Sequence, residues 1–573
     1  MKLKFNGFLV LLLVLVAQLT FAQERAVSGT VSDNTGMPLP GVSVLVKGTK
    51  TATQTDFDGK YSIKAAPNQV LIFSYIGMKS QELPASSTNV NAKLKNDSVE
   101  LESVVVTALG VKKSSRALGY ATQEVKAADI TRANNNSLSG ALQGKLAGVA
   151  ITPSSGAPGA SSQIIIRGAR SFTGNNTPLY VIDGMPVASQ ADFSTGNGVT
   201  GADIANRAVD IDPNEIESIN VLKGQAASAL YGLRASNGVI LITTKSGKNL
   251  AQGGKPVITF NTSTSFETIS KKPDTQDEYA QGSNGVFNPN ASTNWGPKIS
   301  ELPNDKVYGG NVANALNGGV LRPGKYYVPQ RAKAGLDPWV APRAYDNIGD
   351  FFKTGFTINN TLNISQATEK TNYSFGVGTS KQDGIIPETG MKRYTAKAVV
   401  DTKLNNEWKT GFSFNYVETK IDKSSSANDG AIVGVFGGPR SYDLKGIPFA
   451  NPSNAYDQIY YRPGVFNNPY WAAKNNEFSE KTNRVYGNAY IQYSPIISES
   501  GRQKLTVKYH AGVDSWTTNY RDIFEFGSKL DLSGNSSSAH LYGTTNDVIN
   551  SLFTLNYNLN ITDDFNMNVL VGN

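Results

Sequence analysis

Few residues of this chain have the chemistry that catalysis or metal binding requires. The 573 residues include no cysteine and two histidines, His510 and His540, and neither histidine has a metal-ligand companion at a recognisable spacing. We also find no convincing pair of carboxylates on a defined scaffold, which glycoside hydrolysis needs. We therefore expect no metal, no cofactor and no enzyme activity. A secreted glycan-active enzyme is kept as an alternative interpretation.

Two short motifs resemble ligand-binding loops but depart from them. The stretch GALQGKL resembles a phosphate-binding loop, yet it is one residue short between its glycines and has Leu146 where a Ser or Thr would hold magnesium. The stretch DFDGKY places Asp56 and Asp58 two residues apart, as in a calcium loop, but its fifth position is Lys60, which is no oxygen donor. We interpret this second stretch as a turn at Asp58-Gly59 between two strands.

The stretch ELESVVVTALGVKK, residues 100–113, has the composition of a β-strand because its valines are β-branched. No tight-turn dipeptide follows that would fold a hairpin partner onto it. We therefore expect an unpaired β-edge, whose backbone groups a partner could capture by strand addition. The alternative is a last strand of the preceding domain or a first strand of the following one.

The first residues indicate where the protein is sent, and the net charge bears on whether it binds nucleic acid. Residues 1–22 have a basic start, an apolar run and a small-residue cleavage site at Ala22, as in a secretory signal peptide. The apolar run is shorter than the roughly 20 residues that a spanning helix needs. The formal net charge is +8, but the basic residues are dispersed, which argues against nucleic-acid binding.

The remaining patterns predict three kinds of element. Short strands between Gly, Pro and Asp turns from about Arg25 to Asn96 predict a sandwich of roughly seven strands. A mixed segment follows, with a helix that opens at the cap residue Ser137 and four strand-like runs, SQIIIRG, PLYVIDG, IESINVLKG and NGVILITTKSG. From about Lys255 onward, long strands alternate between apolar and polar residues.

The long strands have the length of transmembrane β-strands, roughly 9–11 residues. Phe412 and Phe414 share one face of such a strand with Trp408, whereas Ser413 and Asn415 share the other. His510 falls on a hydrophilic face, so we expect it to line the lumen. We place strands near 256–268, 353–366, 371–384, 391–404, 407–420, 481–495, 503–518, 546–561 and from 565 onward.

The links between these strands are of two kinds. Tight links follow the even-numbered strands, and two long segments, roughly 269–352 and 421–480, follow odd-numbered ones. Short turns on one rim and long loops on the other are typical of outer-membrane barrels. A water-soluble sandwich is the alternative.

The chain closely resembles the N-terminal half of a SusC/RagA-type TonB-dependent outer-membrane transporter of Bacteroidetes. The motifs that carry the resemblance are VVVTALG, ALQGKLAGVAIT, SSGAPGASSQIIIRGARSFTGNNTPLYVIDGMPV and IESINVLKGQAASALYGLRASNGVILITTKSG. It implies a mainly β fold with a signal peptide (1–22), a carboxypeptidase-regulatory-like β-sandwich (23–97), a TonB box and linker (98–113), a mixed α/β plug (114–248) and part of a transmembrane antiparallel β-barrel (249–573). Such barrels have about 22 strands. We count nine, and we expect a truncated sequence.

The resemblance also implies site residues. The TonB box would be Val104, Val105, Val106, Thr107, Ala108, Leu109 and Gly110. Candidates for a latch between plug and barrel are Arg167, Asp183 and Lys223, for which plain turn residues are the alternative. Candidates for a ligand-binding or lid-binding loop are Tyr456, Tyr460, Tyr461, Tyr470 and Trp471, for which loop packing is the alternative.

Active import of a large nutrient across the outer membrane is the function that the resemblance implies. The nutrient would be a glycan fragment or an oligopeptide, and TonB, with ExbB and ExbD, would pull on the plug. A SusD-like surface lipoprotein would cover the barrel, and outer-membrane lipid would surround it. Siderophore or cobalamin uptake is an alternative within the same machinery, and a surface adhesin is an alternative outside it.

Overall fold

The structure is a computed structural model that divides into two compact units, residues 1–104 with 113–117 and residues 105–112 with 118–573. It describes residues 25–49, 51–75, 78–94, 104–106, 112–114, 122–132, 137–170, 176–192, 202–223, 231–425, 430–464, 466–498, 502–529, 537–562 and 565–572.

The first unit contains the predicted seven-stranded sandwich. One sheet has the order β4-β1-β7 and the other the order β3-β2-β5-β6. Val27, Val44, Leu71 and Phe73 fill the core between the sheets. The strands are β1 (Arg25–Ser32), β2 (Ser43–Val46), β3 (Ala52–Gln54), β4 (Lys60–Ala65), β5 (Val70–Ser74), β6 (Gln81–Pro84) and β7 (Ala92–Lys93).

The stretch DFDGKY is the turn that its sequence predicts. The Asp56 side chain accepts hydrogen bonds from the backbone N–H groups of Asp58 and Lys60, at 3.0 and 2.8 Å. The Asp56 carboxylate thus stabilises the turn between β3 and β4 by accepting hydrogen bonds from the backbone, as Asp side chains commonly do in turns.

The predicted TonB box is not a bare edge in its described part. Val104–Val106 (β8) forms a two-stranded sheet with Lys112–Ser114 (β9), so the expectation that no hairpin partner lies nearby is wrong. The expectation rested on the absence of a two-residue turn motif, but a longer link can also join two paired strands. Thr107, Ala108, Leu109 and Gly110 lie outside the described residues.

The plug of the second unit is built on a five-stranded sheet of order β10-β15-β16-β13-β14. A hairpin, β11 (Val149–Pro153) with β12 (Ser162–Ile166), and the short helices α2 (Ala127–Thr131) and α3 (Leu138–Leu142) accompany it. Ser137 caps α3 as predicted, since its Oγ accepts the Gly140 N–H at 3.1 Å. The sheet strands are β10 (Thr122–Lys126), β13 (Leu179–Ile182), β14 (Met185–Val187), β15 (Ile216–Leu222) and β16 (Val239–Thr244).

The described part of the plug also contains three one-turn helices: η3 (Arg207–Asp210), η4 (Pro213–Glu215) and η5 (Leu233–Ala235). Among the described residues, no helix has both the length and the apolar composition that crossing a membrane requires.

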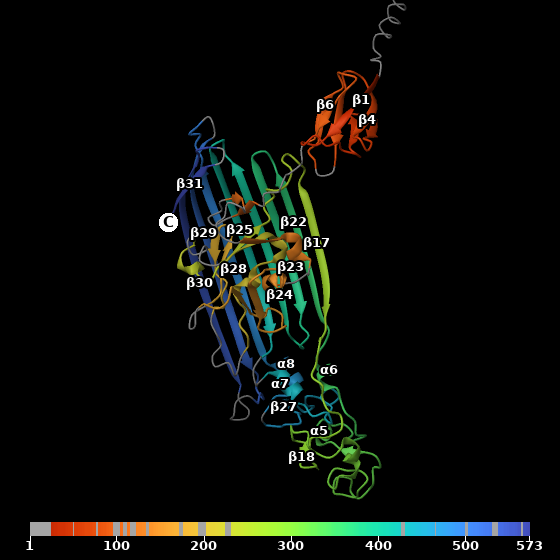
Figure 1. The fold of residues 1–573 in the computed structure, drawn as a ribbon. Coiled ribbons are helices and arrows are strands. Elements are labelled where there is room, and N and C mark those ends of the chain that lie inside the picture. Colours follow the sequence, from red (N-terminus) through yellow and green to blue (C-terminus); the bar gives the residue numbers. More distant parts are fainter. Residues whose placement is uncertain are drawn as a thin grey trace, which may run out of the picture. The chain divides into compact units, whose positions relative to one another are not determined.

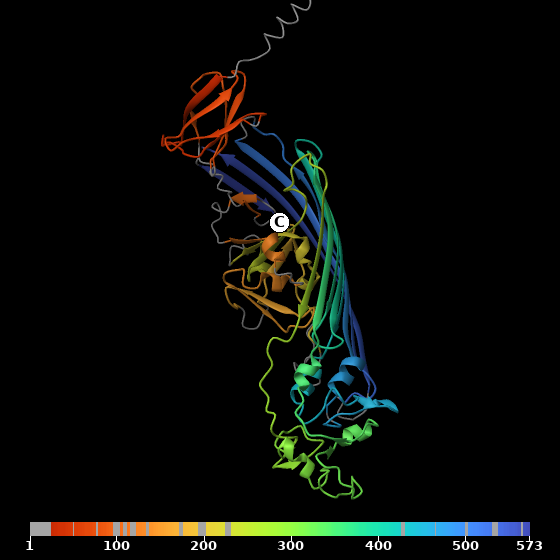
Figure 2. The same ribbon diagram turned by 90° about the vertical axis from the view of Figure 1, so that its right-hand side faces the viewer.

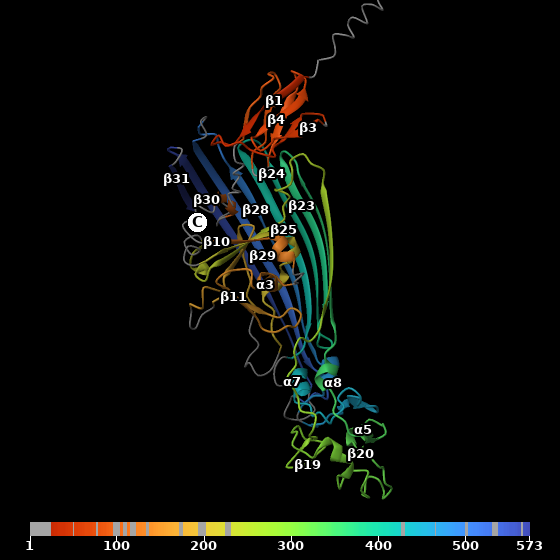
Figure 3. The same ribbon diagram turned by 45° about the vertical axis from the view of Figure 1, so that its right-hand side comes forward.

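Nine antiparallel strands, each paired with the next in chain order, form one curved sheet, which we call the wall (Figure 1). All nine strands predicted from the sequence are therefore confirmed. The plug lies against the concave face of the wall (Figures 2 and 3). The strands are β17 (Val257–Glu267), β22 (Gly355–Ala367), β23 (Thr371–Asp383), β24 (Gly390–Lys403), β25 (Trp408–Lys423), β28 (Glu477–Tyr493), β29 (Gln503–Phe524), β30 (Ser538–Asn560) and β31 (Asn566–Gly572).

Side chains alternate across the wall as expected. Phe412 and Phe414 are exposed on the convex face, whereas Ser413 and Asn415 are buried on the plug side. His510 is also buried on the plug side, and its Nε2 lies 2.9 Å from Asn488 Oδ1. An apolar outer face and a polar inner face are what a lipid-embedded barrel wall requires.

The two long segments between wall strands fold together into one compact module, which we call the outer module. Its elements lie at one end of the wall (Figure 2). They are β18 (Gly282–Ser283), β19 (Val286–Phe287), η6 (Ile299–Asn304), β20 (Tyr326–Tyr327), α5 (Pro329–Lys333), β21 (Trp339–Val340), α6 (Asn347–Phe351), α7 (Ala431–Phe436), β26 (Ala450–Asn451), β27 (Asn454–Gln458) and α8 (Pro469–Asn475).

Candidate functional site

A buried arginine of the plug, Arg207, joins the plug to the wall. It opens the one-turn helix η3, and its side chain has no exposed surface. Its guanidinium forms ion pairs with Asp210 of the same helix at 3.4 Å and with Glu480 of β28 at 3.3 Å. Asp192 of the plug approaches Arg207 Nε at 3.9 Å. Arg207 therefore lies among three carboxylates, one of which belongs to the wall.

A second arginine, Arg484 of β28, reaches the same carboxylates from the wall side. It contacts both oxygens of Asp514 on the neighbouring strand β29 at 2.8 Å. It also contacts Asp210 Oδ2 at 3.3 Å and donates to the backbone carbonyl of Arg207 at 2.9 Å. Asp210 thus lies between two arginines, one from the plug and one from the wall.

Hydrogen bonds from the wall satisfy the remaining oxygens of this cluster. Trp516 Nε1 and Tyr520 Oη donate to Asp192 at 2.7 and 3.0 Å. Thr419 Oγ1 donates to Asp210 at 3.0 Å, and Lys423 Nζ lies 2.9 Å from Glu480. We call Asp192, Arg207, Asp210, Glu480, Arg484 and Asp514 the ion-pair network.

A smaller cluster lies on β24, beside the network. Arg393 pairs with Asp212 of the plug at 3.3 Å and donates to the Val209 carbonyl at 2.9 Å. Thr395 Oγ1 donates to the Glu215 carboxylate at 2.8 Å. Burial, together with the nearby charge of Asp212, raises the pKa of the Glu215 carboxyl.

The energetics of buried ion pairs show what such an interface can do. Burial alone would lower the pKa of the Arg207 guanidinium, but the carboxylates of Asp210, Glu480 and Asp192 outweigh that effect and raise it. Removing one partner of a buried pair costs about 3–5 kcal/mol, because the other charge is left without compensation. The network therefore fixes the plug against the wall in one geometry, and loss of any one of its charges would be costly.

The three latch residues predicted from the sequence lie elsewhere. Arg167 is exposed at a turn with φ 57°, and Asp183, at φ 48°, accepts hydrogen bonds from Thr244 N and Oγ1 at 2.9 and 2.7 Å. Lys223 donates to Gln123 at 2.9 Å, and burial, with the Arg167 charge, lowers its pKa. In the described part of the chain, none of the three forms an ion pair with the wall, and their geometry matches the turn alternative.

Sequence reasoning missed Arg207 and Asp210, although a signal was present. Both are charged residues within a mostly apolar stretch, ADIANRAVDI, which also contains Asp203 and Asn206. On the wall, Arg484 and Asp514 occupy inward positions in the middle of long strands. Buried charges of this kind need partners, so charges at inward positions are the residues to search for in such sequences.

The predicted loop aromatics are mostly core residues of the outer module. Tyr460, Tyr461 and Trp471 are buried, and both tyrosine hydroxyls donate to the Gly434 carbonyl, at 2.8 and 3.2 Å. Tyr470 is partly buried and donates to the Asp350 carbonyl, whereas Tyr456 is exposed and packs edge-on against Phe526. Packing within the module is therefore the role that the structure gives to Tyr460, Tyr461 and Trp471.

Two family models match the chain. The TonB-dependent Receptor Plug Domain matches residues 114–239. The CarboxypepD_reg-like domain matches residues 27–106, so this match runs into the segment predicted to contain the TonB box. Neither model describes a catalytic domain.

Curated relatives match most of the chain. It is 31% identical over 476 residues to TonB-dependent receptor P26 of Formosa agariphila, which covers 82% of the chain and 41% of that protein. It is 28% identical over 585 residues to TonB-dependent receptor SusC of Bacteroides thetaiotaomicron, covering 97% of the chain and 50% of that protein. The chain therefore spans about half the length of these relatives.

A solved structure shows the same fold. The RagAB peptide importer in its open-open state superposes with a TM-score of 0.59 at 21% identity, covering 82% of the chain and 48% of that one. The plug and sandwich matches, the relatives and this fold agree with one another. The chain belongs to the SusC-like TonB-dependent receptors, which are outer-membrane proteins.

Proposed function

We propose that the complete protein actively imports a large nutrient, a glycan fragment or an oligopeptide, and that TonB drives the displacement of its plug. The ion-pair network is the observation that supports this proposal. It combines a folded plug that closes the concave side of the wall with a charged interface that can be disrupted in one step. A static closure would gain as much from apolar packing, since buried pairs add little net stability over well-packed apolar side chains.

The pulling partner in this proposal is TonB, energised by ExbB and ExbD, and the captured strand is the segment from Val104 to Gly110. For capture by strand addition, β8 must exchange its partner β9 for a strand of TonB. Replacing Val105 with Pro removes a backbone donor from the captured edge. Uptake should collapse while ligand binding at the cell surface stays near the wild-type level.

Displacement of the plug can be tested with an engineered disulfide, because the chain has no cysteine of its own. A Cβ atom built on Gly512 of β29 would lie 2.9 Å from Met185 Cγ of the plug. Cysteines at 185 and 512 would therefore have Cβ atoms close to the separation of about 3.5–4.5 Å that a disulfide needs.

The oxidised Met185→Cys/Gly512→Cys protein should bind ligand but fail to import it, and reduction should restore import. Met185→Cys alone is the matched control. Normal import by the fully oxidised double variant would exclude displacement of the plug as a body.

The SusD-like lipoprotein is the proposed partner above the barrel. Because Tyr460, Tyr461 and Trp471 are core residues, their removal would unfold the outer module and would not test this contact. Tyr456 and Phe526 are about half exposed and form an aromatic pair, which suits an interface anchor. Replacing both with Ala should release the lipoprotein during detergent extraction without changing the stability of the barrel, whereas full co-purification would exclude this pair as an anchor.

A further inference from the structure

Four lysines form one row across the convex face of the wall. Lys420 of β25 lies opposite Lys392 of β24 on one side and opposite Lys481 of β28 on the other. Lys392 in turn lies opposite Lys381 of β23. Residues directly opposite in antiparallel strands share a face, and the two-residue period places Lys420 on the same face as the exposed Phe414. All four side chains are exposed, and we call these four residues the lysine row.

The lysine row is unfavourable for the protein by itself. It crosses four neighbouring strands, which is roughly 14 Å at about 4.8 Å per strand. Side chains directly opposite each other have Cβ atoms about 5 Å apart, and like charges at that separation are destabilising. An anion placed along the row would remove this repulsion.

Nearby carboxylates do not neutralise the whole row. Three of the lysines form ion pairs, Lys381 with Asp383 at 3.3 Å, Lys420 with Asp422 at 3.1 Å and Lys481 with Glu418 at 3.2 Å. These pairs are exposed to a large extent, so each contributes little. Lys392, between two other lysines, has no ion pair in the part of the chain that the structure describes.

The length of the strands places the row at a membrane boundary. At the other end of β25 and β28, Trp408 and Tyr493 stack with their ring centroids 4.6 Å apart. Aromatic girdles of this kind mark the boundaries of an apolar band about 25 Å tall. From position 408 to Lys420 is 12 residues, which is about 40 Å along the strand and about 30 Å along the membrane normal at a tilt of roughly 40°. With this girdle at one boundary, the lysine row lies at the headgroup level of the other, where the outer module begins.

The surface between the two boundaries is apolar, and the two ends differ in charge. Moving inward from the lysine row, the convex face presents the exposed Tyr394 and then the exposed Val377. At the far end of the same four strands, the convex positions are uncharged: Thr371, Thr402, Trp408 and Tyr493. A requirement for solubility alone would place charges at both ends.

We propose that the lysine row binds the phosphate groups of a lipid in the membrane leaflet on the outer-module side. The Lys ammonium is a compact point charge that suits phosphate. A phosphate beside Lys392 would contact lysines of two neighbouring strands, and the acyl chains would lie along Tyr394 and Val377. This continuity with the apolar band favours a lipid over a soluble anion. The inference concerns the barrel in its membrane and does not depend on the imported nutrient.

The test measures lipid binding to the full-length protein in detergent by native mass spectrometry. The probes are lipid A, the same lipid A after hydrofluoric acid has removed its phosphates, and inorganic phosphate. Lipid A should bind saturably, and the phosphate-free form should not. An excess of inorganic phosphate should not displace lipid A, because it has no acyl chains to occupy the apolar surface.

Lys392→Gln should weaken lipid A binding about fivefold, which is the contribution of one lysine near a charged lipid surface. Lys392→Arg keeps the charge and should bind as the wild type does. Lys403→Gln, at the other end of the same strand, is the matched control and should also bind normally. Replacing all four lysines of the row with Gln should abolish saturable binding, and Glu418→Gln should strengthen it about twofold by removing a competing carboxylate.

Thermal stability separates a lipid site from a structural role. Without lipid A, Lys392→Gln should not lower the melting temperature, because it removes a like charge from the row. With lipid A, the rise in melting temperature should be smaller for Lys392→Gln than for the wild type. A lower melting temperature of this variant without lipid A would show that the lysine serves the fold, and would overturn the proposal.

Three binding results would also overturn the proposal. Equal binding of the phosphate-free lipid would show that the apolar band alone holds the lipid. Unchanged binding after replacement of all four lysines would place the lipid elsewhere on the wall. Displacement of lipid A by inorganic phosphate would assign the row to a soluble anion.

Discussion

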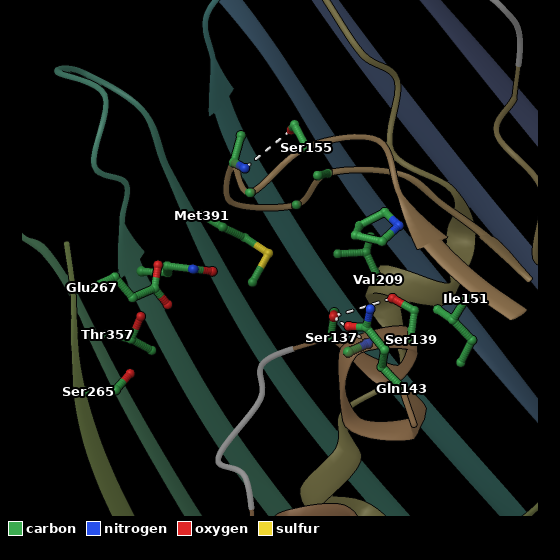
Figure 4. Close-up of a pocket in the computed structure, with 17 residues that line it drawn as sticks. Ser137, Ser139, Gln143, Ile151, Ser155, Val209, Ser265, Glu267, Thr357 and Met391 are labelled. Atoms are coloured by element: carbon green, nitrogen blue, oxygen red, sulfur yellow. Dashed lines mark hydrogen bonds between the residues drawn. The ribbon is translucent and has the colours of Figure 1, made fainter. Parts of the chain in front are cut away.

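The plug meets the wall in two different ways. Toward β28 and β29 the contact is a buried network in which Arg207, Asp210 and Arg484 have no exposed side-chain surface. Toward β17, β22 and β23 the contact leaves a pocket (Figure 4), and a buried hydroxyl, that of Thr357, has no partner. On the first side the charges are paired with one another, although the Arg207 Nε–H has no hydrogen-bond acceptor among the described residues. On the second side it is a neutral hydroxyl that is unpaired.

This difference means that the plug is attached to the wall mainly through β28 and β29, and not through β17, β22 and β23. Charged groups that pair only in one geometry resist small displacements and fail together, because each loss leaves another charge without compensation. A hydroxyl group without a partner, such as that of Thr357, contributes nothing to attachment. The two sides can therefore be altered independently, and the following variants are chosen to do so.

The largest effect should come from Arg484→Met, which leaves Asp210 and Asp514 buried without their shared cation. We expect the plug to lose about 3–5 kcal/mol of attachment. Protease sensitivity of the plug in proteoliposomes, and entry of vancomycin into cells, would both increase. Arg521→Met removes an exposed pair with Glu477 and should cost less than about 1 kcal/mol. Equal effects of the two substitutions would show that the buried ion-pair network holds the plug no better than an exposed ion pair does.

A smaller effect is expected for Asp210→Asn, which keeps the shape of the side chain and removes the charge between the two arginines. The loss should be about 2 kcal/mol, since hydrogen bonds to a charged group are replaced by neutral ones. Urea titration of plug protection measures it. Combined with Arg484→Met, the loss should be clearly less than the sum, because the residues share one network. Simple additivity would show that the arginines act separately.

Asp203→Ala should act on the pocket side alone. It removes the acceptor for Ser154 and Ser161 and frees the loop between β11 and β12 at a local cost of about 1–2 kcal/mol. Plug protection against urea should remain near the wild-type value. A loss of plug protection instead would show that the loop belongs mechanically to the ion-pair network.

The smallest effect concerns Glu215 beside the network. Burial and Asp212 raise the pKa of its carboxyl in the folded protein, against the opposing charges of Lys397 and Arg393. A raised pKa means that its stabilising contribution is present at low pH and is lost as pH rises through the folded-state value. Glu215→Gln should therefore raise the melting temperature by about 2 °C at pH 8 relative to wild type, and less at pH 5. If the difference in melting temperature between Glu215→Gln and the wild type grew toward acid pH, the pKa of Glu215 would not be raised in the folded protein.

The sequence predicts the scaffold well and the contacts poorly. The wall strands follow from residues within each strand, since Phe412 and Ser413 face opposite ways by the two-residue period alone. Ser137 caps α3 for an equally local reason. The wall partner of Arg207 is not local, because Glu480 lies 273 residues away and reaches it only when β28 passes beside the plug.

The aromatic residues of the outer module show the same limit. Their composition identifies Tyr460, Tyr461 and Trp471 as candidates for an interface, but aromatic side chains suit a core equally well. Which of the two they form depends on the packing of two segments that lie on either side of β22 to β25 in the chain. Tyr456 is exposed and Trp471 is buried although both are aromatic, so residue type alone does not predict which of them is in the core.

The sequence by itself determined the family, the nine wall strands and the sandwich, because motif, period and turn chemistry act over a few residues. The tertiary structure decided which charges hold the plug, which aromatics are buried and where a ligand-sized space remains. These properties arise from groups on different strands that share one volume, and desolvation makes their energies depend on every neighbour at once. Arg167 and Arg207 are both plug arginines in the sequence, and only burial beside Glu480 and Asp210 distinguishes the second from the first.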